Sequence, residues 1–318
     1  METISSSLTP LGFFERLRAG AACAVAWLLL GTVGWQMAKP LDPQMAVTLT
    51  ASGRAILATG PALLVLAVVA AAIGTAIIGR RLPEAGALCA AVGLAGMSLR
   101  GGSMQVMLAY YADQSTQLDQ ITQHRRGLMI AMLADALLWA AILVTAWMSM
   151  LIVRRWLWPE LVAAETPPSD PKSAIPSAFV RGWPALAVTA VVATIVIWLT
   201  IARTPVASIA RGQIIASVGG GLFLGAMAAR YFTGNNDSVW YALAVPVVAV
   251  IGYVLGHFSA DMSWAEGPFL PFASLATTPP HLLARPLPIE YIAVGLIGAL
   301  TGFWTGQRME HVVEHELT

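Results

Sequence analysis

Four ionisable residues lie within long apolar stretches of the sequence and are the first candidates for chemistry: Arg100, Asp135, His257 and Glu290. A charged side chain at the centre of a bilayer costs from about 3 to above 10 kcal/mol, depending on the method. Such residues are therefore found where they pair with one another, or where they bind a ligand, an ion or a proton.

Helical rise places the first two residues at similar heights. Arg100 lies about 24 Å along its helix from Glu84, and Asp135 lies about 28 Å along the next, antiparallel helix from Arg154. The difference is within the reach of an arginine side chain. The sequence therefore predicts an Arg100–Asp135 pair in the outer part of a membrane.

His257 and Glu290 repeat this arrangement. His257 lies along its helix from Ser238, and Glu290 lies along the next helix from Arg308, each at about 27 to 28 Å. Each pair can be interpreted in two ways. In the first, which we prefer, the pair is structural and locks a helical hairpin; in the second, it forms a ligand, ion or proton site.

The composition identifies the elements that must carry these residues. Hydrophobic residues make up 57% of the chain and charged residues only 11%, against roughly 25% in an ordinary soluble domain. We predict an all-α integral membrane protein, a polytopic bundle of about eight transmembrane helices. The expected spans are 19–37, 56–78, 85–111, 127–153, 185–202, 214–229, 239–258 and 289–305.

The spans are expected to form a 4+4 arrangement. Residues 1–160 make the first half, residues 161–183 a Pro- and Ser-rich linker on the cytoplasmic side, and residues 184–318 the second half. Weak similarity between the halves, such as "GRAILA" from Gly53 and "RGQIIA" from Arg211, suggests a parallel pseudo-repeat or chance resemblance among apolar spans. The excess of Lys and Arg on one side predicts that both termini are cytoplasmic, in a bacterial inner (plasma) membrane.

Glycines at four-residue spacing predict close helix packing. Gly298, Gly302 and Gly306 form one ridge, and Gly221 and Gly225 form another. Small residues at this spacing let helix backbones touch in a membrane. Packing inside the chain is the preferred use, with a contact to a partner as the alternative.

Two further segments are expected on the outer side. Met104 to Tyr111 and Arg126 to Ala134 are predicted to form a helical hairpin that projects from the membrane. The loop 259–288 is rich in proline and carries Trp264, Phe269 and Phe272, a composition typical of a segment lying in the interface or against a partner protein.

The common catalytic and cofactor motifs are absent or incomplete in the sequence, so an enzyme is not expected. "HVVEH" near the C-terminus has the spacing of inverted zinc proteases, but only three residues follow it to supply a further ligand. The sequence contains no P-loop, no GxSxG and no dinucleotide fingerprint. Cys23 and Cys89 are interpreted as packing residues, and neither a cofactor, a metal nor a nucleic-acid partner is expected.

Two functions are compatible with these features. The preferred one is a non-catalytic membrane subunit or scaffold that packs with partner membrane proteins or with further copies of itself. The alternative is a permease or channel-like carrier that uses the Arg100/Asp135 and His257/Glu290 pairs.

Overall fold

The computed structural model describes residues 12–42, 45–51, 56–113, 118–165, 174–203, 207–261 and 278–316. Within these ranges the chain is helical and contains no strand. The predicted all-helical class is therefore confirmed. Among the described residues, six helices are long and apolar enough to cross a membrane: Phe13–Ala38, Thr59–Ile78, Asp119–Leu157, Gly182–Thr200, Ala210–Thr233 and Ser238–Phe258.

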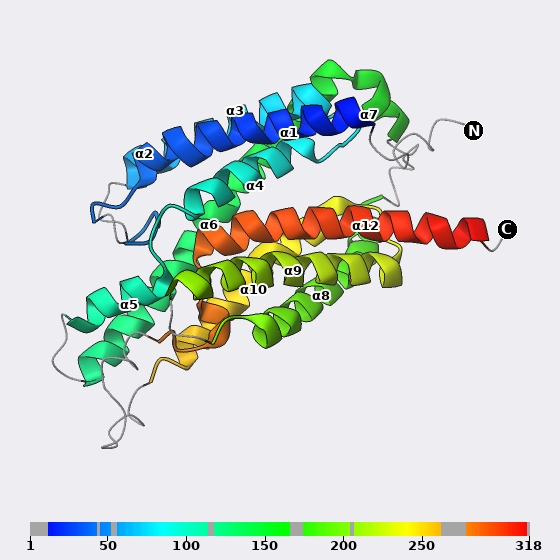
Figure 1. Ribbon diagram of the computed structural model, residues 1–318. Coiled ribbons are helices and arrows are strands. Elements are labelled where there is room, and N and C mark those ends of the chain that lie inside the picture. Colours follow the sequence, from blue (N-terminus) through cyan, green and yellow to red (C-terminus); the bar gives the residue numbers. More distant parts are fainter. Residues whose placement is uncertain are drawn as a thin grey trace.

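The first group of helices is built from residues up to Glu165. Its elements are α1 (Phe13–Leu28), η2 (Leu29–Gly34), α2 (Trp35–Ala38), α3 (Ile56–Ile78), α4 (Ala85–Ser98), α5 (Met104–Asp113), α6 (Leu118–Leu157) and α7 (Pro159–Glu165). α1, η2 and α2 follow one another without a break. α1, α3, α4 and α6 pack against one another, as Figure 1 shows.

The second group follows with α8 (Ala174–Thr200), α9 (Ala207–Thr233), α10 (Ser238–Phe258), η4 (Leu282–Ala284), η5 (Glu290–Val294) and α12 (Gly295–Glu316). α9 packs between α8 and α12, and α10 packs against α8 and α12 (Figure 1). α6 and α10 join the two groups. The early residues of α8 and most of α7 fall in the range 161–183 that was expected to be a linker.

The eight predicted spans are not all recovered. The third span, predicted over 85–111, is interrupted after Ser98, and the remaining α4 of 14 residues is about 21 Å long, short of a hydrocarbon core of about 30 Å. The break lets Gly102 N–H donate to Met45 O at 3.0 Å, so a backbone group of the 45–51 segment is satisfied there. The eighth span forms a helix in η5 and α12, but it is not among the six spanning candidates.

The predicted hairpin is present. α5 and the first turns of α6 extend beyond the ends of the other helices (Figure 1). α6 has 40 residues and is therefore about 60 Å long, roughly twice the thickness of a hydrocarbon core. We refer to this end of the molecule as the hairpin end. The opposite end holds the first turn of α1 and the last turns of α12, and we refer to it as the termini end (Figure 1).

The glycine ridge of α12 lies on the backbone of α9. A Cβ added at Gly298 would collide with the carbonyl oxygen of Gly219, and one added at Gly302 would collide with that of Phe223. A Cβ at Gly306 would lie 2.8 Å from the Cβ of Arg230. The two helices therefore approach closely along the whole ridge.

Two glycines of α9, Gly221 and Gly225, face its other neighbour. A Cβ at Gly225 would lie 2.6 Å from the carbonyl oxygen of Thr189, and one at Gly221 would lie 2.5 Å from Cγ1 of Ile197, both on α8. α9 is thus held between two helices at backbone contact. Both glycine sets are used in contacts within the chain.

Candidate functional site: buried polar clusters at the hairpin end

Two buried segments at the hairpin end lie outside the long helices. Residues 45–49 lie between α2 and α3, and residues 283–289 lie before η5; all of these side chains are buried. Backbone groups in such segments need hydrogen-bond partners from the protein where water is excluded. Two buried carboxylates accept some of these hydrogen bonds.

Asp135 binds the first segment. Its carboxylate is 0% exposed, and Oδ1 accepts hydrogen bonds from the backbone N–H groups of Leu49 at 2.5 Å and Thr50 at 3.0 Å. Oδ2 accepts from the indole N–H of Trp139 at 2.9 Å, one turn further along α6. Both carboxylate oxygens are therefore engaged, and the acid fastens the chain between α2 and α3 to α6.

The predicted Arg100–Asp135 pair is not formed. Arg100 is exposed and lies in the turn after α4, because that helix ends at Ser98 instead of continuing through residue 111. The acceptor positions of Asp135 are occupied by two backbone N–H groups and an indole. Helical counting placed the two residues at one height, but it assumed an unbroken helix.

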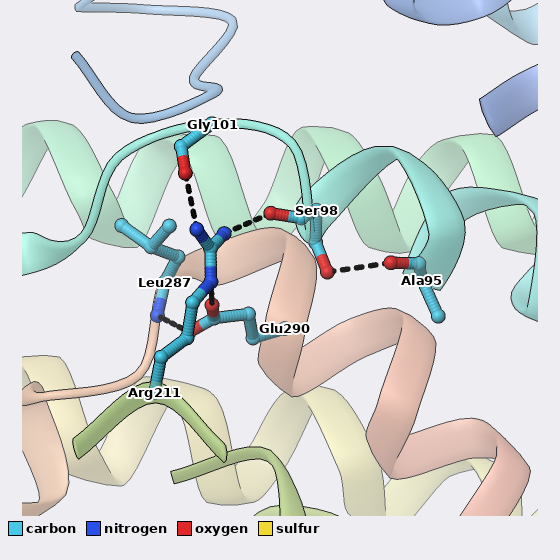
Figure 2. Close-up of polar contacts among 6 residues, drawn as sticks. All are labelled: Ala95, Ser98, Gly101, Arg211, Leu287 and Glu290. Atoms are coloured by element: carbon cyan, nitrogen blue, oxygen red, sulfur yellow. Dashed lines mark hydrogen bonds and ion pairs between the residues drawn. The ribbon is translucent and has the colours of Figure 1, made fainter. Parts of the chain in front are cut away.

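Glu290 belongs to a second cluster, shown in Figure 2. Its carboxylate is 2% exposed, and Oε1 lies 3.5 Å from Nε of Arg211, a residue of α9. Oε2 accepts from the backbone N–H of Leu287 at 2.8 Å. The ion pair thus joins α9 to η5, and the hydrogen bond fixes the end of the 283–289 segment.

The same guanidinium connects the two groups of helices. Arg211 donates from Nη2 to the carbonyl oxygen of Ser98 and from Nη1 to that of Gly101 (Figure 2). The last carbonyls of a helix lack intrahelical donors and carry partial negative charge. Arg211 therefore satisfies the end of α4 and is in turn neutralised by Glu290.

The predicted His257–Glu290 pair is also not formed. His257 lies in the last turn of α10, and its Nδ1 is 3.3 Å from the carbonyl oxygen of Arg126 on α6. Glu290 is directed instead at Arg211 and at the backbone N–H of Leu287. His257 thus joins α10 to the base of the hairpin.

Two buried tyrosines complete the second cluster. The hydroxyl of Tyr253 donates to the carbonyl oxygen of Pro286 at 2.7 Å, and that of Tyr291 donates to the carbonyl oxygen of Leu283 at 2.7 Å. Their rings meet edge to face with centroids 6.0 Å apart. The 283–289 segment is therefore held through its carbonyls as well as its N–H groups.

Sequence reasoning missed Arg211, Trp139 and the 45–51 segment. One signal for Arg211 was available: α9 and the η5–α12 helix run in the same direction, and Arg211 and Glu290 both lie near their starts. Comparing heights from that shared end would have matched this base with this acid. No sequence pattern indicates that the 45–51 backbone turns inward to meet Asp135.

The remaining predicted interface residues are the aromatic side chains of the outer loop. Trp264, Phe269 and Phe272 lie outside the residues that the structure describes.

An apolar groove runs between α6 and α10. It has a volume of about 270 Å³ and a floor formed by Ile292 and Leu296. Val144, Met148 and Leu151 line it from α6, and Val239, Leu243 and Pro246 line it from α10. The spacing of the α6 residues puts them on one helical stripe.

Comparison of the chain with protein-family models, with curated proteins and with solved structures found no match in any of the three.

Proposed function

We propose that this protein is a non-catalytic subunit of a membrane complex, which holds a transmembrane helix of another membrane protein in the groove between α6 and α10. The observation that carries this proposal is the groove itself. Its walls are apolar side chains from two long helices, and Val144, Met148 and Leu243 in it are exposed. A helix fits between two others at interaxial distances of about 8–10 Å and gains dispersion contacts there.

The polar clusters support the same proposal. Asp135 and Glu290 are bound by backbone N–H groups and, for Glu290, by Arg211 of the same chain. Buried charges satisfied in this way fix the fold of non-helical segments. They give the molecule a rigid frame on which a partner helix can be positioned.

A position of both termini on the cytoplasmic side is part of the proposal. The start of α1 and the end of α12 lie at the same end of the molecule (Figure 1), as a chain with both termini on one side of a membrane requires.

The proposal is tested by photo-crosslinking in native membranes. A photoreactive phenylalanine analogue replaces Met148, which is 52% exposed in the groove, or Val191 of α8, which is 58% exposed and does not line it. We expect position 148 to capture one defined polypeptide through a transmembrane segment, and position 191 to capture it far less. The bulky change Leu243→Trp should abolish that product.

Three results would contradict the proposal. Lipid adducts alone at position 148 would mean that acyl chains fill the groove. A crosslinked product that contains only this chain would mean that a second copy, and not another membrane protein, occupies the groove. A product that is equally strong at position 191 would show that the groove has no special role.

A carrier is the second candidate, favoured by the interrupted α4. Discontinuous helices whose free carbonyls meet a charged residue occur at transporter binding sites, and Arg211 bridges the two groups at such a break. Labelling Gly101→Cys with a membrane-impermeant maleimide separates the candidates. A subunit should react from one side at most, whereas a carrier should react from each side in turn.

A further inference from the structure

A second cavity lies at the termini end, where the ends of three helices meet. It has a volume of about 480 Å³ and is lined by α1, by the end of α3 with its following turn, and by α7. Its polar lining comprises three arginines and one glutamate: Glu15, Arg18, Arg80 and Arg81. Its apolar lining is Ile77, Ile78 and Leu161.

The charge in this cavity favours an anion. Glu15 forms an ion pair with Arg81 at 3.0 Å, so its charge is already matched. Arg18 and Arg80 add two exposed guanidiniums to the same lining. Guanidiniums bind phosphate oxygens through paired hydrogen bonds, which makes arginine the preferred residue for this group.

The apolar surroundings indicate the form in which the phosphate arrives. Ile77, Ile78 and Leu161 provide a hydrocarbon floor beneath the guanidiniums. Phe13 and Phe14, in the first turn of α1, expose their rings next to Glu15. A ligand with both a phosphate and an acyl chain would contact the guanidiniums and the apolar side chains together.

We infer that this cavity, which we call the cationic pocket, binds the phosphate headgroup of an anionic phospholipid. Arg18 and Arg80 contact the phosphate, Arg81 is held beside them by Glu15, and the first acyl carbons lie on the isoleucine floor. Basic pockets at the ends of transmembrane helices bind anionic headgroups by this combination. Lipid binding in the cationic pocket does not depend on what occupies the groove between α6 and α10.

The test uses the full chain in nanodiscs of phosphatidylcholine with and without phosphatidylglycerol. Native mass spectrometry measures the phosphatidylglycerol retained on the protein. Arg18→Gln combined with Arg80→Gln should weaken retention by about tenfold or more, because each basic residue near an anionic lipid surface contributes measurably to binding. Arg155→Gln is the matched control: this exposed arginine lies in the last turn of α6 and does not line the pocket.

Equal loss of retention in the double variant and in the control, or no loss in the double variant, would overturn the inference. A separate measurement titrates inorganic phosphate into the protein in pure phosphatidylcholine nanodiscs. If phosphate binds there and its binding depends on Arg18 and Arg80, while retention of phosphatidylglycerol in the mixed nanodiscs does not depend on them, the pocket takes a soluble phosphate and the lipid is rejected. Thermal unfolding of each variant verifies that the variants are folded.

Discussion

At the scale of single residues, buried acids hold non-helical backbone in place. Asp135 accepts hydrogen bonds from two backbone N–H groups and Glu290 from one, and Glu290 also neutralises Arg211. A carboxylate is suited to this task because it accepts several hydrogen bonds at once. The sequence predicted that these acids pair with other groups inside the protein, but it could not predict the backbone N–H groups that bind them, because those groups lie where helices are interrupted.

Removing the charge of Glu290 should reveal the free-energy cost of burying the Arg211 guanidinium without a counter-ion. We expect Glu290→Gln to lower the free energy of unfolding by about 3–5 kcal/mol, because it leaves a guanidinium without its counter-ion inside the bundle. Unfolding in mild detergent, followed by circular dichroism, measures the change. Combining Arg211→Gln with Glu290→Gln should recover part of the loss.

Glu15→Gln is the matched control for this experiment. It removes one carboxylate from an exposed ion pair with Arg81, whose side chain is 46% exposed. Exposed pairs of this kind contribute about 0–1 kcal/mol. A loss at Glu290→Gln no larger than that of the control would show that the buried pair does not stabilise the fold.

At the scale of elements, close backbone contact determines which helices are neighbours. The ridge of Gly298, Gly302 and Gly306 was visible in the sequence, and so was the pair Gly221 and Gly225. The helices that pack against these glycines could not be predicted from the sequence, because any aliphatic helix offers a matching surface. The structure assigns α9 to the first set and α8 to the second.

One pair of alanine substitutions tests this packing. Gly302→Ala places a methyl group against the carbonyl of Phe223 and should destabilise the protein by about 1–3 kcal/mol, because α9 and α12 must separate. Gly220→Ala meets open space and should be neutral or stabilising by up to about 1 kcal/mol, the helix propensity difference. Unfolding midpoints of the two variants give the comparison.

The opposite order of stability would contradict close packing of α9 on α12. Equal midpoints would show that the helices separate at no cost, which backbone contact does not allow.

At the scale of the whole molecule, two groups of helices are joined by polar contacts at both ends. Arg211 reaches the carbonyls of Ser98 and Gly101 towards the hairpin end, and the indole of Trp304 donates to Glu84 at 3.1 Å, beside the turn that precedes α4. α6 and α10 also pack against each other and join the groups. The sequence predicted a division into halves. It did not predict the contacts between the two groups, because they depend on tertiary structure and have no pattern in the sequence.

Cleavage of the chain between the groups tests how firmly they hold together. A protease site inserted within residues 166–173 allows the full-length, folded protein to be cut after purification. We expect the two fragments to remain together during size-exclusion chromatography in mild detergent. Arg211→Gln should increase the fraction that separates, and Arg155→Gln should not.

Separation of the fragments in the unsubstituted protein would show that the connecting chain, and not the interface, keeps the groups together. Equal separation in both variants would assign no role to the Arg211 contacts.

The length of α6 couples two regions that lie far apart. One uninterrupted helix carries the hairpin, then Asp135, then the stripe of Val144, Met148 and Leu151. Each residue added to a helix turns everything beyond it by about 100° and advances it by about 1.5 Å. Inserting a single residue between the hairpin and Asp135 would therefore rotate the hairpin by more than a quarter of a circle relative to the groove. The number of residues between them in α6 thus sets the orientation of the hairpin relative to the groove.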